Sequence, residues 1–220
     1  MRLQHAAKRL ERFYQGSLTS RLAALESAFC TNGKTSYTAQ CVVEEIDTTL
    51  LSALLAIKRV AGQINVSIHA VGILLALPQI LKRGERVETL SLGAGNTGRA
   101  FDLVTNRRVA EFKFFHWQGG SETIRQNALF KDFYYLAESR IRKPKFLYVL
   151  GCDVPLRFLN GGRALRSVMS KNAKLMSDFR EQHGERFKAV REYFAYRKEA
   201  VQIVDLLGRI PSLRAILSED

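Results

Sequence analysis

The chain has 220 residues and carries 34 Lys and Arg against 21 Asp and Glu, which gives a formal net charge of +13 at pH 7. Such an excess of positive charge favours an anionic partner such as nucleic acid. Hydrophobic residues make up 46% of the chain, enough for a domain with a real core. Cys30, Cys41 and Cys152 are too scattered for a disulfide framework, so we expect free thiols in a reducing compartment.

In chain order, the first part of the sequence is helical. Residues 1–28 predict one or two helices with a break near residues 15–17, and residues 38–60 predict a long amphipathic helix that packs on the core or on another subunit. The N-terminus lacks an apolar secretory segment. The apolar stretches at 50–57 and 68–77 are each too short to cross a bilayer. We therefore expect a cytoplasmic protein with no membrane partner.

The middle of the chain mixes strand and helix patterns, and the last part returns to helical spacing. In the middle we expect a helix at 66–81, strands at 86–92, 100–105 and 109–115, a helix at 121–139 and a strand at 145–150. After residue 151 we expect helices at 154–159, 163–179, 184–207 and 212–217. This order predicts an α/β fold with a mixed sheet. Its expected parts are an N-terminal helical region (1–62), a core (63–152) and a C-terminal helical region (153–220), forming one compact domain overall.

Three charged residues lie in two apolar runs that read as a β-hairpin, and they are the main candidates for function. If Asn106 and Arg107 form the turn, Asp102 lies directly opposite Glu111 on the next strand. Side chains alternate along a strand, so Lys113 shares the face of Glu111. Opposed residues have Cβ atoms roughly 5 Å apart, where two carboxylates repel unless a positive charge lies between them.

A divalent cation would remove this repulsion. Mg²⁺ is held by one or two carboxylates together with water and substrate phosphate, and Mn²⁺ accepts similar ligands. A lysine beside such a site can orient the attacking water or neutralise charge that develops on the phosphate. Asp102, Glu111 and Lys113 therefore predict a metal-dependent phosphodiesterase with Mg²⁺ or Mn²⁺ as its cofactor. The competing interpretation is a solvated sheet face with an ordinary cross-strand ion pair.

This pattern resembles the PD-(D/E)xK nuclease superfamily, whose core motif is an acid on one strand and Glu-x-Lys on the next. The resemblance covers about residues 66–151. It implies a restriction-endonuclease-like core, built from a helix, a three-stranded meander, a second helix and a further strand. It also implies a nuclease that hydrolyses phosphodiester bonds, with DNA preferred over RNA because the resembled families mostly act on DNA.

Two further positions are similar to the RecB-type branch of that superfamily. By that resemblance His69, on the helix before the strands, would be a third metal ligand. Gln126, on the later helix, would hold the substrate backbone or the lysine, although Phe130 stands where the branch has tyrosine. Glu44 or Glu45 is the alternative for the extra acid. For His69 and Gln126, a core histidine and a helix-surface amide are equally good interpretations.

Basic residues around the expected site suggest how a nucleic acid would be held. The candidates for backbone contacts are Arg99, Arg107, Arg108, Arg125 and Lys131. An alternative function is a non-enzymatic nucleic-acid-binding or assembly protein that keeps the nuclease fold and uses the three charged residues as a structural cluster. A homodimer is possible, since two cuts in a duplex often require two sites.

Overall fold

The computed structural model describes residues 3–14, 17–29, 34–93, 100–115, 117, 122–210 and 213. The chain divides into two compact units, Met1–Asn65 and Val66–Asp220. Helix α4 (Thr48–Ile80) contributes residues to both. The division at residues 62 and 152 that we expect from the sequence stays a prediction.

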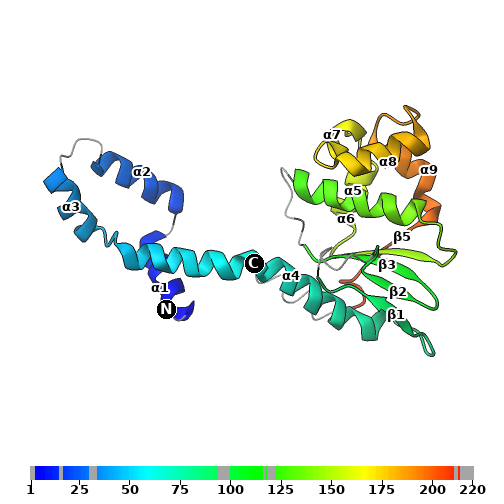
Figure 1. Ribbon diagram of the computed structural model, residues 1–220, viewed down its shortest axis with the longest axis horizontal. Helices are drawn as coiled ribbons and strands as arrows, with labels where there is room; N and C mark the ends of the chain where they lie inside the picture. The colour runs from blue at the N-terminus through cyan, green and yellow to red at the C-terminus, as the bar shows by residue number, and fades with distance from the viewer. Residues whose placement is uncertain are drawn as a thin grey trace. The chain divides into compact units, whose positions relative to one another are not determined.

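The first unit is helical. It contains α1 (Leu3–Tyr14), α2 (Leu18–Phe29), α3 (Lys34–Val43) and the first part of α4 (Figure 1). Residues 1–28 contain two helices, as one of the two expectations had it, and residues 15 and 16 of the expected break lie outside the described residues. The single helix expected at 38–60 is wrong. The chain leaves the helical conformation after α3, where Glu45 has a φ of 54°, a value uncommon outside glycine. Asp47 then opens α4 by accepting the Leu50 N–H at 2.8 Å.

Helix α4 joins two segments that the sequence pattern predicts to be separate helices, at 38–60 and 66–81. Its 33 residues include both apolar stretches, at 50–57 and 68–77. Within the described part of the chain, it is the one helix long and apolar enough to cross a membrane by length and composition. The expectation that these stretches are too short is therefore wrong for the helix as a whole. A core helix of a soluble protein passes the same test, so the finding alone assigns no membrane.

The second unit contains a mixed five-stranded sheet, which confirms the expected α/β class. The strands lie in the order β1-β2-β3-β4-β5; the first three are antiparallel, and β3, β4 and β5 are parallel. Their bounds are Val87–Leu90, Leu103–Thr105, Val109–Lys113, Lys145–Val149 and Gln202–Asp205. Helix α5 (Thr123–Glu138) connects the antiparallel part to β4.

The segment between β4 and β5 differs from the expected run of long helices. It contains α6 (Asp153–Leu159), α7 (Leu165–Met169), α8 (Ala173–His183), α9 (Val190–Arg197) and a 3₁₀ turn (Lys198–Ala200). The helix expected at 163–179 is therefore two helices. The helix expected at 184–207 is wrong, because its end is strand β5. The helix expected at 212–217 lies outside the described residues except for residue 213.

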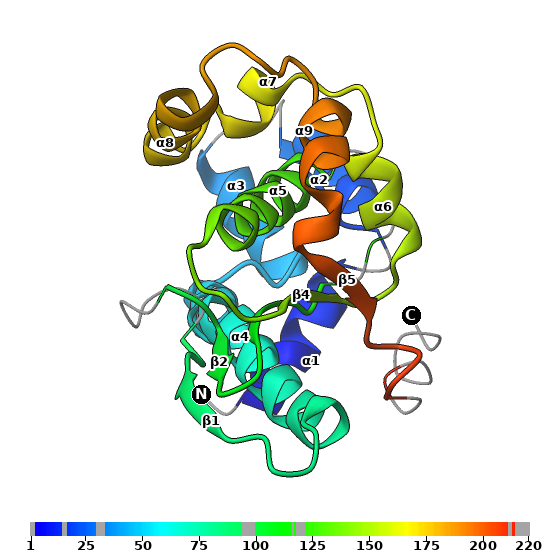
Figure 2. The same cartoon turned by 90° about the vertical axis from the view of Figure 1, so that its right-hand side faces the viewer.

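Helices cover both faces of the sheet. Figure 2 shows α5 to α9 on one side of the sheet and the end of α4 on the other. On the α4 side, Ile73 and Ala76 pack with Phe112 of β3. On the other side, Val109 of β3 packs with Leu129 of α5. Odd and even residues of β3 thus face opposite layers, as the alternation along the strand predicts.

Gly72 allows α4 to lie close to the sheet. A Cβ atom at this position would come within 2.6 Å of the Phe114 ring, much closer than a normal contact. His69 lies one helical turn earlier on α4, so the same close approach sets the position of its imidazole. Gly62, on the same helix, has no such neighbour within 4 Å.

We expect Gly72→Ala to lower the free energy of unfolding by about 1–3 kcal/mol, because the added methyl group must displace the Phe114 ring or the helix. Gly62→Ala is the matched control. It should be neutral or stabilising by up to about 1 kcal/mol, since alanine favours a helix where space is open. Urea unfolding of both variants measures the difference, and equal stabilities would contradict this account of Gly72.

Candidate active site

One pocket of the second unit brings together five of the ten expected site residues: His69, Asp102, Glu111, Lys113 and Lys131. Its volume is about 250 Å³. Its lining comes from the second half of α4, the residue after β1, the segment just before β2, strand β3 and the second half of α5. The titratable residues that line it are His69, Asp102, Glu111, Lys113, Lys131, Asp132 and Tyr135.

The expected hairpin register explains why the two acids meet. Leu103 pairs with Ala110 and Val104 with Val109, as predicted. Continuing this register by one residue places Asp102 opposite Glu111, and both side chains line the same pocket. The arrangement is therefore fixed by backbone pairing in β2 and β3, which does not depend on the charged side chains.

Asp102 is buried and held on both oxygens. Its Oδ1 lies 3.2 Å from Nε2 of His69, and its Oδ2 accepts the Phe112 N–H at 3.0 Å. Burial acts to raise the pKa of Asp102, but the hydrogen bonds from His69 and Glu111 outweigh burial, so the pKa lies below its ordinary value. Asp102 is therefore the carboxylate that keeps its negative charge.

The pKa of Glu111 is shifted in the opposite direction to that of Asp102. Burial raises the pKa of this carboxyl well above its ordinary value, and the negative charges of Asp132 and Asp102 raise it further. The carboxyl groups of Glu111 and Asp102 act on each other in opposite directions: Glu111 lowers the pKa of Asp102, and Asp102 raises the pKa of Glu111. One proton shared between two neighbouring acids relieves the repulsion that a cation would otherwise relieve.

Lys113 forms a close ion pair with Asp132 of α5. Burial alone would lower the pKa of Lys113, but the negative charges of Asp132 and Glu111 outweigh it and leave the pKa raised. The ammonium group thus stays charged beside the two acids. Asp132 is itself buried and is not among the residues predicted for the site. An acid among the buried apolar positions of α5 was the available signal.

Two other helix residues border this pocket. Lys131 lines it with an exposed side chain, as expected for a contact with an anionic substrate. The hydroxyl of Tyr135, another residue absent from the expected site, donates to Asp178 of α8 at 3.1 Å. These contacts connect the pocket to the helices that follow β4.

Gln126 and Arg125, at the start of α5, are not among the described side chains that line the pocket. The amide oxygen of Gln126 accepts a 2.5 Å hydrogen bond from Arg163. Arg125 pairs with Glu122 at 3.0 Å, and its guanidinium lies over the Phe115 ring. Gln126 thus bonds to a residue before α7, and the structure does not bring it to the lysine.

Arg107 and Arg108 lie at the hairpin turn, at the opposite end of β2 from Asp102. Arg107 is exposed there. The expected nucleic-acid contact of Arg108 is corrected, because its side chain is buried and bonds to Glu85 through two nitrogens, each at 2.6 Å. A third nitrogen donates to Tyr148 at 2.8 Å. Arg99, the remaining candidate, lies outside the described residues.

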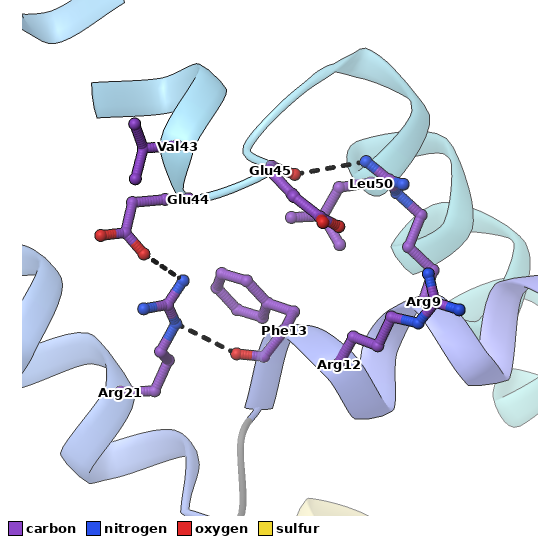
Figure 3. Close-up of a pocket in the computed structure, with 8 residues that line it drawn as sticks. All are labelled: Arg9, Arg12, Phe13, Arg21, Val43, Glu44, Glu45 and Leu50. Carbon is purple, nitrogen blue, oxygen red and sulfur yellow. Dashed lines mark hydrogen bonds and ion pairs between the residues drawn. The ribbon is translucent and has the colours of Figure 1, made fainter. Parts of the chain in front are cut away.

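Glu44 and Glu45, the alternative acids, line a pocket of the first unit (Figure 3). Glu44 forms an ion pair of 2.7 Å with Arg21, whose Nε also donates to the carbonyl of Phe13. Arg9 donates to the backbone carbonyl of Glu45. These contacts join α1 and α2 to the turn between α3 and α4, so the Glu44 carboxylate and the Glu45 backbone have a structural role within the unit.

The pocket offers the two carboxyl groups of Asp102 and Glu111 to a hard cation, but a third protein ligand is not in place. Asp102 and Glu111 supply oxygen donors, and Mg²⁺ needs only one or two carboxylates when water and phosphate complete its shell. Among the residues that the structure describes, no three His, Cys, Asp or Glu side chains are arranged to hold a metal together. His69 contacts Asp102, which suits a residue that orients a ligand.

Comparisons with known proteins returned nothing similar to this chain: no family model, no curated protein and no solved structure matches it.

The Glu85–Arg108 pair should make stability depend on acid pH. Burial acts to raise the pKa of Glu85, but hydrogen bonds from Arg108 and Thr105 outweigh it and lower the pKa to about 2. The stabilisation is therefore complete above about pH 4.5 and is lost as the pH falls towards 2.

We expect Glu85→Gln to lower the free energy of unfolding at pH 7 by roughly 2–3 kcal/mol, because it leaves Arg108 buried without its counter-ion. The difference in free energy of unfolding between the wild type and the variant should shrink as the pH falls, because Glu85 of the wild type becomes protonated. Denaturant unfolding between pH 7 and 2 measures it. Glu88→Gln, an exposed acid paired with Lys143, should change stability by less than about 1 kcal/mol; an equal loss in both variants would refute this pairing.

Proposed function

We propose that the protein is a metal-dependent nuclease with a restriction-endonuclease-like core. The observation that carries this proposal is the convergence of Asp102, Glu111 and Lys113 in one pocket at the β2–β3 hairpin. An unpaired buried acid is costly, and two adjacent ones are more so. A pocket that keeps both acids beside a lysine carries the charges that can bind a cation and a phosphate.

In this proposal Asp102 and Glu111 hold a Mg²⁺ or Mn²⁺ ion. Such an ion would stabilise negative charge on the scissile phosphate and lower the pKa of bound water. Glu111 would have to be deprotonated to serve as a ligand, because only the carboxylate form binds a metal. His69 holds Asp102 in the orientation seen here, through its Nε2 contact.

Lys113 and Lys131 provide the positive side of the pocket. The buried ammonium of Lys113 lies beside the acids, where it can orient the attacking water or stabilise negative charge on the phosphate. Lys131 is more exposed and suits a contact with the adjoining backbone. The net charge of +13 raises the local concentration of a phosphate polymer. DNA is preferred to RNA from the sequence resemblance alone.

A second candidate function is nucleic-acid binding without catalysis. The pairing of Lys113 with Asp132 and the contacts on both Asp102 oxygens favour it. Here the same residues form a self-contained ion-pair cluster with no need for a cation. The two functions differ in whether metal binds at this pocket and whether cleavage requires it.

Calorimetric titration with Mn²⁺ tests the nuclease proposal directly. We expect Asp102→Asn and Glu111→Gln to lower Mn²⁺ affinity by at least about 100-fold, because each removes a charged ligand. Glu88→Gln, an exposed acid of β1, is the control and should bind as the wild type does. Lys113→Met should keep metal binding but reduce cleavage of plasmid DNA by about 100-fold or more. Cleavage that survives in all three site variants would reject the proposal.

Asp132 acts in this proposal as a positioning residue for Lys113. We expect Asp132→Asn to lower kcat by about 10-fold while Mn²⁺ affinity changes by less than about 3-fold, since the ammonium loses its partner but the two ligands remain. Asp178→Asn is the control, because this acid bonds to Tyr135 and Lys174. A parallel loss of metal affinity in Asp132→Asn would instead make Asp132 a ligand.

A further inference from the structure

A second pocket of the second unit lies among the helices that follow β4. It has a volume of about 190 Å³ and is lined by α7, by α8 and by the turn between α8 and α9. Figure 2 shows α7 and α8 on the far side of α5 from the sheet. Gly184, with a φ of 56°, ends α8. The Leu165 N–H donates to the carbonyl of Lys188 at 2.9 Å, which fixes the turn against the start of α7. We call this hollow the α7–α8 pocket.

The inside of the α7–α8 pocket is apolar and includes a half-buried aromatic ring. Phe187 packs on the core rings of Phe179 and Tyr193, with centroids 6.4 and 5.7 Å apart, yet it stays partly exposed. Methionine side chains beside it can adapt to the shape of a ligand. Such a lining suits a flat ring that stacks on Phe187. The apolar lining residues are Leu165, Met169, Met176, Phe179 and Phe187.

The rim of the same pocket is basic. Arg166, Arg180 and Lys188 line it, each from a different segment, and all three are exposed. Within the described part of the chain, none of their guanidinium or ammonium groups forms a hydrogen bond or an ion pair. The lining includes one acid, Glu185. The charge of the rim therefore favours an anionic ligand.

We propose that the α7–α8 pocket holds one unstacked base of a single-stranded nucleic acid, and that the cations of its rim contact the neighbouring phosphates. Sites that bind single strands combine aromatic side chains, on which bases stack, with a basic groove that follows the backbone. A base within a duplex is paired and stacked, so a single strand, a loop or an end is what presents one. The proposal rests on the nucleic-acid partner proposed above but not on cleavage.

The volume of the pocket limits what can enter it. Sites for drug-sized ligands and cofactors measure about 300–1,000 Å³, whereas this pocket measures about 190 Å³. It has room for one ring system and leaves the sugar and phosphates outside. The charged part of the ligand then lies at the rim, where the arginines and the lysine are.

The aromatic surface continues beside the pocket. Tyr196 is 45% exposed, and its ring centroid lies 5.2 Å from that of Phe187. The guanidinium of Arg186 lies over both rings, 4.9 Å from the centroid of Phe187 and 4.4 Å from that of Tyr196. Arginine and aromatic side chains both stack on bases. Arg186 and Tyr196 therefore offer a second stacking surface to the next base of the strand.

Fluorescence anisotropy with the full chain in EDTA tests the pocket without metal or cleavage. The probes are a labelled oligodeoxythymidine and a sugar-phosphate strand of the same length without bases. The wild type should bind the thymidine strand at least about 5-fold more tightly, because the abasic strand cannot stack. Phe187→Leu should weaken binding of the thymidine strand about 5-fold and leave the abasic strand unchanged, whereas Phe187→Tyr keeps a ring and should bind as the wild type does.

Equal affinity of the wild type for the two strands would overturn the proposal. So would a Phe187→Leu variant that binds both strands as the wild type does or weakens both alike. Displacement of the thymidine strand by polyglutamate at the same concentration of charge would assign the pocket to acidic peptides instead.

The rim predicts a change in salt dependence. Arg180→Gln and Lys188→Gln should each reduce the slope of log Kd against log salt concentration by about 0.7, the value of one phosphate contact on a single strand. Arg83→Gln is the matched control, because Arg83 is exposed between α4 and β1, away from the pocket. An equal change of slope in Arg83→Gln would mean diffuse attraction and would reject the rim contacts.

Photo-cross-linking of the wild-type chain keeps the test decisive if Phe187→Leu does not fold. A strand that carries 5-iodouracil should cross-link to Phe187 or Met176, as mass spectrometry of the peptides would show. Cross-links confined to residues outside the pocket would overturn the proposal. A chain that prefers the thymidine strand but neither binds Mn²⁺ nor cleaves DNA keeps this pocket and loses the nuclease. Cleavage without that preference does the reverse.

Discussion

Strand β3 imposes the constraint on which the rest of the second unit depends. It is hydrogen-bonded on both edges, antiparallel to β2 and parallel to β4, so its register cannot slip without breaking both pairings. Its even-numbered residues Ala110 and Phe112 fill the layer beneath α4. Its odd-numbered residues Glu111 and Lys113 are thereby turned towards α5 and the pocket. The alternation of side chains along β3 therefore places apolar residues in the core and charged residues in the candidate site.

The polar centre is costly for a fold of this size. Each buried acid loses hydration, and the contacts of Asp102 with His69 and the Phe112 N–H recover only part of that loss. Apolar residues of similar volume at these positions would give a simpler core. Retaining the acids is therefore more consistent with a requirement of function than of stability, which is why the nuclease interpretation outranks the structural one.

The hairpin could be predicted because its pairing is local in the sequence. The roles of Arg108 and Asp132 could not, because their partners are distant in the sequence. The β2–β3 register and the meeting of Asp102 with Glu111 follow from turn position and side-chain alternation, both readable in adjacent residues. Arg108 is held by Glu85, 23 residues earlier, and no local pattern records that pairing. Asp132 stands among apolar positions of α5, but no neighbouring residue in the sequence shows that Lys113 is its partner. The restriction-endonuclease-like core itself stays a proposal, whereas the mixed α/β sheet is established.

The parallel edge of the sheet has a consequence for how the chain is made. Strand β4 ends at Val149, but β5 begins only at Gln202, after the intervening helices have been synthesised. Until then the β4 edge has no neighbour on that side, and its residues Leu147 and Tyr148 belong to the cores that are not yet closed. Such an unpaired apolar edge invites strand addition from another molecule. During translation, the ribosome-bound chain is thus most vulnerable to aggregation between these two strands, and a chaperone is most useful there.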